Sequence, residues 1–149
     1  MTRPALSQWD AFMVETLLAK GMSQQTLIQH IQNENADALN AYDQTFNYSD
    51  LIQTAKKAPK ILLEAIETGY TIKFVSNFGI KRLLGLKFGF EDGVDYHMSE
   101  TRFDNLTLTE NQLHVFQPML SPNWKLFSEK NKQDKYEVAI IHATAVEQV

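Results

Sequence analysis

Basic side chains gather in the middle of this 149-residue sequence, in a pattern that suits the binding of phosphate groups. Residues 51–90 carry seven basic and two acidic side chains, whereas residues 1–50 and 91–149 are both net acidic. The basic side chains are those of Lys56, Lys57, Lys60, Lys73, Lys81, Arg82 and Lys87. Neutralisation of phosphates by Lys and Arg supplies most of the non-specific affinity for nucleic acids. We therefore predict a nucleic-acid-binding surface here; the alternative is an ordinary solvated surface.

Aromatic residues lie between these cations in the sequence. The segment could therefore also bind the unpaired bases of a single strand. Phe78, Phe88 and Phe90 occupy the same segment as the basic residues. Rings next to cations stack on the bases of single strands while the cations contact the backbone. The alternative is that Phe88 and Phe90 belong to the core. A helix that opens with Asn77-Phe78-Gly79 could also hold a phosphate at its first N–H groups.

A helical pattern near the N-terminus predicts a second way to bind nucleic acid. An apolar helix that ends at Gly21 is followed at once by a helix that Ser23 caps. The pattern is Gly21-x-Ser23-Gln24-x-x-Leu27-Ile28-x-x-Ile31. It resembles the second helix of helix-turn-helix DNA-binding regulators, and the resemblance covers residues 9–42. It implies that the following helix enters the major groove. The base-reading side chains would then fall among Asn35, Asp37, Ala38, Asn40 and Ala41.

The same region departs from the helix-turn-helix pattern in its turn and in its charge. The turn is Gln32-Asn33-Glu34, where such regulators have a glycine and a small apolar residue. The following helix carries Asp37 and ends at Asp43, with no Lys or Arg. Acidic side chains facing DNA oppose binding, because phosphates carry the same charge. The alternative reading is a helical hairpin used for packing or dimerisation.

Catalytic and metal-binding patterns are missing from the sequence. It has no cysteine, and the histidines, His30, His97, His114 and His142, show no spacing typical of a helical zinc site. His97 could act as a general base only if a carboxylate met it in a cleft, and otherwise it is an exposed strand residue. We therefore predict no catalytic residue, no metal and no cofactor.

The order of expected elements predicts an α+β fold, with a helical N-terminal half and then a mixed half that holds a small antiparallel sheet. The expected helix starts lie at Ser7, Ser23, Ala36, Ser49, Pro59, Asn77 and Thr109. The expected extended segments are residues 70–75, 94–98, 124–129 and 136–142. We predict a helical unit at residues 1–48 and an α+β unit at residues 49–149, packed together as one domain.

The sequence holds no run of about 18 apolar residues, so we expect no membrane span and no membrane partner. Residues 1–6 lack the apolar core of a signal peptide, and we therefore expect a cytoplasmic protein. The predicted function is that of a small nucleic-acid-binding protein, regulatory in transcription, that forms a homodimer. The alternative is an adaptor that binds another protein through its acidic flanks and exposed aromatics and binds no nucleic acid. Trp9 and Trp124 lie at the ends of expected elements, where a tryptophan is either a core anchor or an interface residue.

Overall fold

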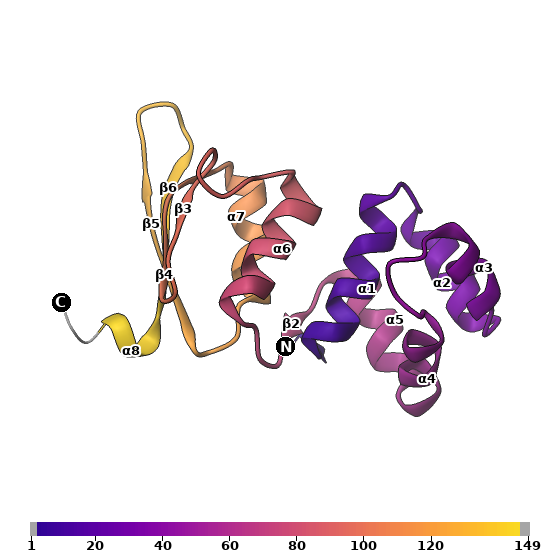
Figure 1. Cartoon of the computed structure of the whole chain (residues 1–149). Helices are drawn as coiled ribbons and strands as arrows, with labels where there is room; N and C mark the ends of the chain where they lie inside the picture. Colours follow the sequence, from indigo (N-terminus) through magenta and orange to yellow (C-terminus); the bar gives the residue numbers. More distant parts are fainter. Residues whose placement is uncertain (1–2, 147–149) are drawn as a thin grey trace. The chain divides into compact units, whose positions relative to one another are not determined.

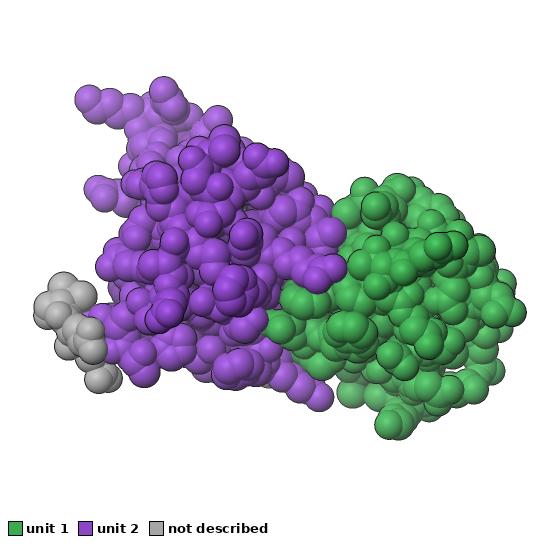
Figure 2. Space-filling view, viewed as in Figure 1, with its two compact units in different colours: residues 1–71 green, residues 72–149 purple. Residues whose placement is uncertain are grey.

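The computed structural model describes residues 3–146 and confirms the α+β fold: helices come first, and a mixed half with an antiparallel sheet follows. The chain divides into two compact units, residues 1–71 and residues 72–149, which Figure 2 colours green and purple. The boundary predicted after residue 48 falls just before a helix inside the first of these units. We refer to the two as unit 1 and unit 2.

Unit 1 is built from helices and one very short strand (Figure 1). Its elements are β1 (Ala5–Leu6), α1 (Gln8–Ala19), α2 (Gln24–Gln32), α3 (Ala36–Tyr42), α4 (Ser49–Lys57) and α5 (Pro59–Thr68). Pro59 opens α5 as predicted, because its missing N–H would have no helical partner in the first turn. Lys56 and Lys57 accordingly lie in the last turn of α4, where cations suit the helix dipole.

Helix α1 is buried along most of its length. The Ser7 hydroxyl caps it by accepting a hydrogen bond from the Asp10 N–H (3.1 Å), and Gly21 follows its end with a φ of 106°. All eight residues 10–17 are buried, including polar ones. Trp9 is 49% exposed and packs edge-on against Phe46 at 4.9 Å. Burial of eight consecutive residues means that α1 is enclosed on more than one side.

The strand predicted at residues 70–75 is mostly wrong. Only β2 (Thr71–Ile72) is a strand, and the Thr71 N–H donates to the Pro4 carbonyl at 2.9 Å. Beyond it the backbone finds side-chain partners in place of a second strand. The Val75 N–H donates to the Ser121 hydroxyl (2.9 Å), and the Trp124 indole N–H donates to the Val75 carbonyl (2.8 Å). These two bonds fix the chain just before the next helix.

Unit 2 is a four-stranded antiparallel sheet whose two longer helices lie on one face (Figure 1). Its elements are α6 (Asn77–Phe88), β3 (His97–Met98), β4 (Arg102–Leu108), α7 (Glu110–Phe116), the 3-10 helix η1 (Gln117–Met119), β5 (Trp124–Lys130), β6 (Tyr136–His142) and α8 (Ala143–Val146). The strand order is β3-β4-β6-β5. Buried side chains such as Phe103, Leu106 and Ile140 lie on the inner face of the sheet, and the alternate side chains form its outer face.

Strand β4 was not predicted from the sequence, because its alternation is interrupted. Asn105 adopts a left-handed φ of 61°, and the register with β6 shifts between Phe103 and Leu106. The extra residue keeps both of these side chains buried although they are three positions apart. The neighbouring predictions are confirmed: Thr109 and Gln112 form a complete capping box at α7, and β5 pairs with β6.

Helix α6 begins and ends at residues that supply specific caps. The Ser76 hydroxyl accepts a hydrogen bond from the Gly79 N–H (3.0 Å), which makes Ser76 the capping residue. Gly89 follows the helix in the left-handed region, with a φ of 71°, and its N–H closes the last turn. The helix therefore runs through Lys87 and Phe88, and Phe90 lies beyond it. This settles which part of residues 87–91 is helical.

Candidate nucleic-acid and ligand site

The helix-turn-helix candidate of unit 1 uses its polar side chains to hold its own fold. Glu34 makes the turn between α2 and α3 in the left-handed conformation, with a φ of 53°. The Asn35 side chain accepts a hydrogen bond from the Ala38 N–H (3.1 Å) and caps α3. The Asn40 side chain accepts one from the Tyr48 N–H at 2.8 Å. Two of the five predicted base readers therefore have structural partners.

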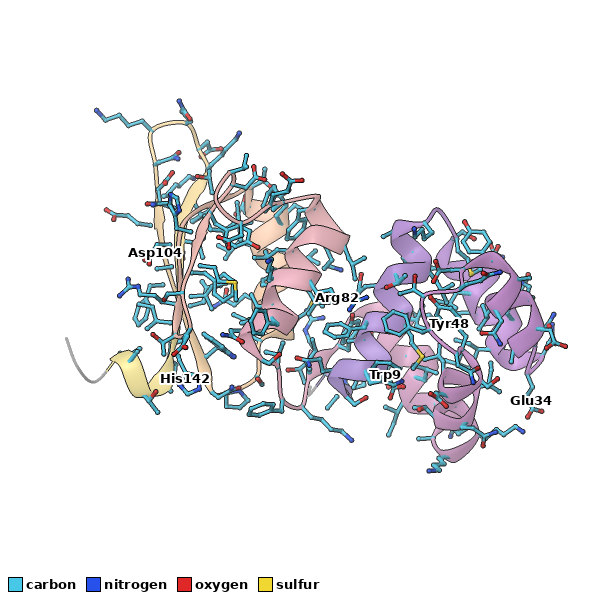
Figure 3. All side chains as sticks on the ribbon, in the orientation of Figure 1. Trp9, Glu34, Tyr48, Arg82, Asp104 and His142 are labelled. Atoms are coloured by element: carbon cyan, nitrogen blue, oxygen red, sulfur yellow. The ribbon has the colours of Figure 1, made fainter. Side chains whose placement is uncertain are left out.

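Helix α3 is also short and acidic, which is unfavourable for major-groove binding. It has seven residues, of which Leu39 is buried, and Asp37 and Ala41 are exposed. Glu34, at the periphery of unit 1 in Figure 3, forms an ion pair with Lys56 (3.1 Å). Both of these side chains are more than half exposed, so the pair contributes little to stability.

The seven predicted basic residues are divided between the two units. Lys56, Lys57 and Lys60 are exposed at the junction of α4 and α5 in unit 1. Lys73 precedes α6 in unit 2, and α6 itself carries Lys81, Arg82 and Lys87. Within unit 2, Lys81 and Arg82 are neighbours on an exposed part of α6, whereas Lys87 is half-buried. The structure therefore brings together the pair on α6.

Two exposed aromatic rings accompany the basic residues of unit 2. Phe74 is 65% exposed and Phe78 is 70% exposed, and they are among the most exposed large apolar side chains of the described residues. Phe78 lies one helical turn before Lys81 and Arg82, so the three share one side of α6. Phe88 is half-buried, with its ring 5.9 Å from that of Phe116, and this agrees with the core alternative.

The first N–H groups of α6 are already hydrogen-bonded to side chains. The Phe78 N–H donates to the Asn77 side chain (2.8 Å), and the Gly79 N–H donates to the Ser76 hydroxyl (3.0 Å). A phosphate at this helix start would have to displace both partners. We therefore place no anion at the N-terminus of α6.

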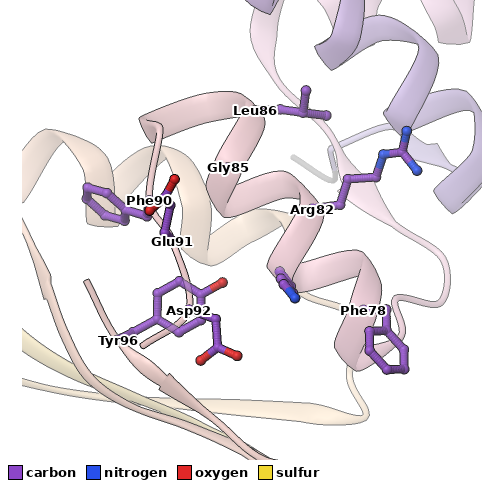
Figure 4. A pocket seen from close by; sticks show the side chains of 9 residues that line it. Phe78, Arg82, Gly85, Leu86, Phe90, Glu91, Asp92 and Tyr96 are labelled. Atoms are coloured by element: carbon purple, nitrogen blue, oxygen red, sulfur yellow. The ribbon is translucent and has the colours of Figure 1, made fainter. Parts of the chain in front are cut away.

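A pocket of about 700 Å³ lies between α6 and the chain that follows it, and we call it the α6 pocket (Figure 4). Helix α6 contributes one wall, formed by Phe78, Lys81, Arg82, Gly85 and Leu86. The opposite wall comes from Phe90, Glu91, Asp92 and Tyr96. The volume is within the range of small-molecule sites. Cations line one wall and carboxylates the other, so the pocket is polarised.

Tyr96 is the buried polar residue of this pocket. It is 1% exposed, and its ring packs on that of Phe103 at 5.6 Å. Its hydroxyl points toward α6 (Figure 4) and has no hydrogen-bond partner among the described residues. Burial raises the pKa of Tyr96 to about 12, helped by the negative charges of Asp92 and Asp95. At neutral pH the hydroxyl is therefore protonated and can donate a hydrogen bond.

A tight turn positions the acidic wall of the pocket. Gly93 has a φ of 85°, and its N–H donates to the Tyr96 carbonyl at 2.7 Å. The Asp95 side chain accepts a hydrogen bond from the Glu91 N–H (2.8 Å), and the Asp92 side chain accepts one from the Met98 N–H (3.1 Å). The turn at Asp92-Gly93 therefore holds Glu91 and Asp92 in the lining of the pocket.

The structure gives no support for a metal centre. Among residues 3–146, no three His, Asp or Glu side chains are grouped so that they could hold a metal ion. His97 is exposed on β3, as the sequence suggested. The His142 ring packs edge-on against Trp124 at 5.1 Å and hydrogen-bonds the Thr144 hydroxyl at 2.8 Å.

Sequence reasoning did not single out the pocket residues Tyr96 and Gly85 or the exposed ring of Phe74. Tyr96 was expected only as part of an extended segment, and Phe74 as part of a strand. Gly85 was not considered, although a glycine inside a helix lowers helix stability by about 1 kcal/mol relative to alanine. A glycine at such a position therefore indicates a structural or functional constraint. A Cβ atom at Gly85 would meet nothing closer than the Phe90 carbonyl oxygen at 3.7 Å. Packing does not require this glycine.

Comparison of the chain with protein-family models, with curated proteins and with solved structures found no match. Over the part of the chain that the structure describes, every helix is too short or too polar to cross a membrane.

Proposed function

We propose that this protein binds single-stranded nucleic acid through unit 2. The surface consists of Lys73, Phe74, Phe78, Lys81 and Arg82, and we call it the α6 surface. The observation that carries the proposal is the exposure of Phe74 and Phe78 beside these cations. Exposed rings gain stacking free energy on unpaired bases, and cations alongside contact the phosphates.

Single strands fit this surface better than a duplex does. Reading a duplex requires an element that enters a groove, and the acidic helix α3 is poorly suited to that task. A single strand exposes the faces of its bases, which stack on aromatic rings whatever the sequence. The expected binding is therefore tolerant of sequence and strongly dependent on salt.

The test is fluorescence anisotropy of labelled DNA and RNA strands of about ten nucleotides. Titrations of the full chain at about 50 and 200 mM salt, with a duplex of the same sequence, measure strand preference and salt dependence. Replacing Phe74 and Phe78 together by alanine should weaken single-strand binding at least about fivefold, because stacking contributes about 1–3 kcal/mol per base. Replacing Lys81 and Arg82 by glutamine should weaken binding and also flatten its salt dependence.

Unit 2 offers matched controls for both changes. Phe127→Ala removes another exposed ring, 48% exposed on the outer face of the sheet, and should leave affinity unchanged. Lys132→Gln with Lys135→Gln removes two exposed cations from the loop between β5 and β6. If the control variants reduce affinity as much as the α6 variants do, binding is non-specific and the α6 surface is not its site.

The alternative function, a protein-binding adaptor, is favoured by the outer face of the sheet. That face presents Phe127, and the Arg102 guanidinium there forms a bidentate ion pair with Asp104 at 2.7 Å. Absence of single-strand binding at low salt, together with a protein partner that Phe127→Ala releases, would support the adaptor in place of nucleic-acid binding.

A further inference from the structure

The α6 pocket combines three features that point to a bound ligand. Its lining is polarised, with Lys81 and Arg82 contributed by α6 and Glu91 and Asp92 by the chain that follows. A ligand that fits must therefore be negative at one end and carry hydrogen-bond donors at the other. Apolar and aromatic side chains complete the lining, which suits a planar ring; Phe90 lies beside the acidic residues, and Phe78 lies at the far end of α6 (Figure 4).

The buried hydroxyl of Tyr96 is the second feature. A hydroxyl kept from water without a partner is unfavourable, and most such groups in native proteins are hydrogen-bonded. The ring is held on Phe103, so the hydroxyl is fixed in place at the pocket wall. A ligand that moves a neighbouring wall side chain aside would reach it and accept its proton in a hydrogen bond.

Gly85 is the third feature. It lies in the middle of the α6 wall, where no close contact excludes a side chain. A larger residue would improve helix propensity but would reduce the space between the walls. The glycine therefore keeps the pocket open.

We propose that the α6 pocket binds one unstacked nucleotide whose base carries an exocyclic amino group. The phosphate lies at Lys81 and Arg82, the base lies against the apolar lining next to the acidic wall, and Glu91 and Asp92 accept hydrogen bonds from the amino group. The Tyr96 hydroxyl donates to a ring nitrogen or carbonyl of the base. Uracil and thymine present a carbonyl oxygen where cytosine has its amino group, and that oxygen faces the carboxylates unfavourably.

This inference rests on the proposed function: the α6 surface binds the strand whatever its sequence, and the α6 pocket selects the one nucleotide that enters it. Calorimetric titration of the full chain with the matched pair CMP and UMP tests it directly. CMP should bind at least about fivefold more tightly than UMP, because one well-formed base-edge contact discriminates by that factor or more. Glu91→Gln should narrow the preference, since an amide can donate to the uracil carbonyl as well as accept from the cytosine amino group.

Two variants test the pocket itself. Gly85→Leu should place a four-carbon side chain in the middle of the α6 wall and weaken CMP binding, whereas Gly85→Ala, the matched control, adds one carbon and should retain binding. Tyr96→Phe should weaken CMP binding about fivefold, because the ligand loses a hydrogen bond. Thermal denaturation of each variant shows that the fold is kept.

The outcomes separate this inference from the proposed function. Equal affinity for CMP and UMP, or full CMP binding by Gly85→Leu, overturns the nucleotide pocket, even where single strands still bind. Displacement of CMP by an equal concentration of inorganic phosphate overturns base recognition as well. Loss of strand binding in the Phe74 and Phe78 double variant, with normal CMP binding in Phe74→Ala alone, supports both ideas. No strand binding by the unmodified chain refutes the proposed function.

Discussion

The hydroxyls of buried tyrosines differ between the two units in whether they have a hydrogen-bond partner. In unit 1 the Tyr70 hydroxyl donates to the Glu15 carboxylate, and the Tyr48 hydroxyl donates to that of Asp43. In unit 2 the equally buried Tyr96 hydroxyl has no partner among the described residues. Unit 1 thus satisfies these tyrosine hydroxyls internally, although the buried Thr16 hydroxyl of unit 1 has no partner among the described residues either, and unit 2 leaves the Tyr96 hydroxyl unpaired. The pocket beside Tyr96 makes the second unit the better place to look for a ligand.

The paired groups of unit 1 also show how burial and hydrogen bonding compete. Burial alone would raise the pKa of Asp43, but hydrogen bonds from Tyr48 and Thr45 outweigh it and hold that pKa below its usual value. Burial raises the pKa of Tyr70, and the charge and hydrogen bond of Glu15 raise it further. The Asp43 carboxyl is thereby kept ionised and the Tyr70 hydroxyl protonated, which are the states that make these two bonds.

The largest expected effect comes from removing one of the internal partners. Tyr70→Phe should lower the free energy of unfolding by about 1.5–3 kcal/mol, the range for a hydrogen bond to a charged group. Urea denaturation measures it, with Tyr42→Phe as a control. The Tyr42 hydroxyl donates to the Lys20 carbonyl at 2.8 Å from a half-exposed side chain, so its loss should cost about 1 kcal/mol or less. An equal effect of the two changes would remove the distinction between the buried pair and a surface bond.

The same change in unit 2 should have the opposite sign. Tyr96→Phe removes a buried hydroxyl that has no partner, and should raise the free energy of unfolding by about 1 kcal/mol. Urea denaturation without ligand measures this value. Greater stability combined with weaker nucleotide binding would be the signature of a group kept for function. Destabilisation similar to that of Tyr70→Phe would break the comparison between the units.

The smallest effect is a difference in alkaline pH dependence. An unfolded tyrosine ionises near pH 10, whereas Tyr96 in the folded chain holds its proton until about pH 12. The folded state then binds more protons than the unfolded state, so stability should fall as pH rises above about 10. Denaturation between about pH 8 and 11 measures this slope, which Tyr96→Phe should make shallower. An unchanged slope would show that Tyr96 ionises normally.

Helix caps, helix starts and hairpins were predictable from the sequence, because they depend on residues a few positions apart. The cap of α1 by Ser7, the opening of α5 by Pro59 and the capping box at Thr109 follow from side chains a few positions apart. The antiparallel pair of β5 and β6 was predicted for the same reason. Their physical basis is contained within one turn of helix or one hairpin.

Features that depend on distant residues were missed. The expected strand after Tyr70 is short because Val75 hydrogen-bonds Ser121, which lies 46 positions away. The α6 pocket was not predicted, because it forms only when the turn at Gly93 returns the chain and brings Tyr96 to the same pocket as Gly85. A local pattern of apolar residues does not show which distant side chains line the same pocket. The glycine in the middle of α6 was the one local feature that indicated an unusual position there.

The irregularity at Asn105 determines which side chains of β4 face the core. In a strand of perfect alternation, residues three positions apart point to opposite faces of the sheet. The extra residue between Phe103 and Leu106 puts both of these side chains on the inner face. Because Tyr96 packs on Phe103, the pocket wall that carries Tyr96 depends on this bulge.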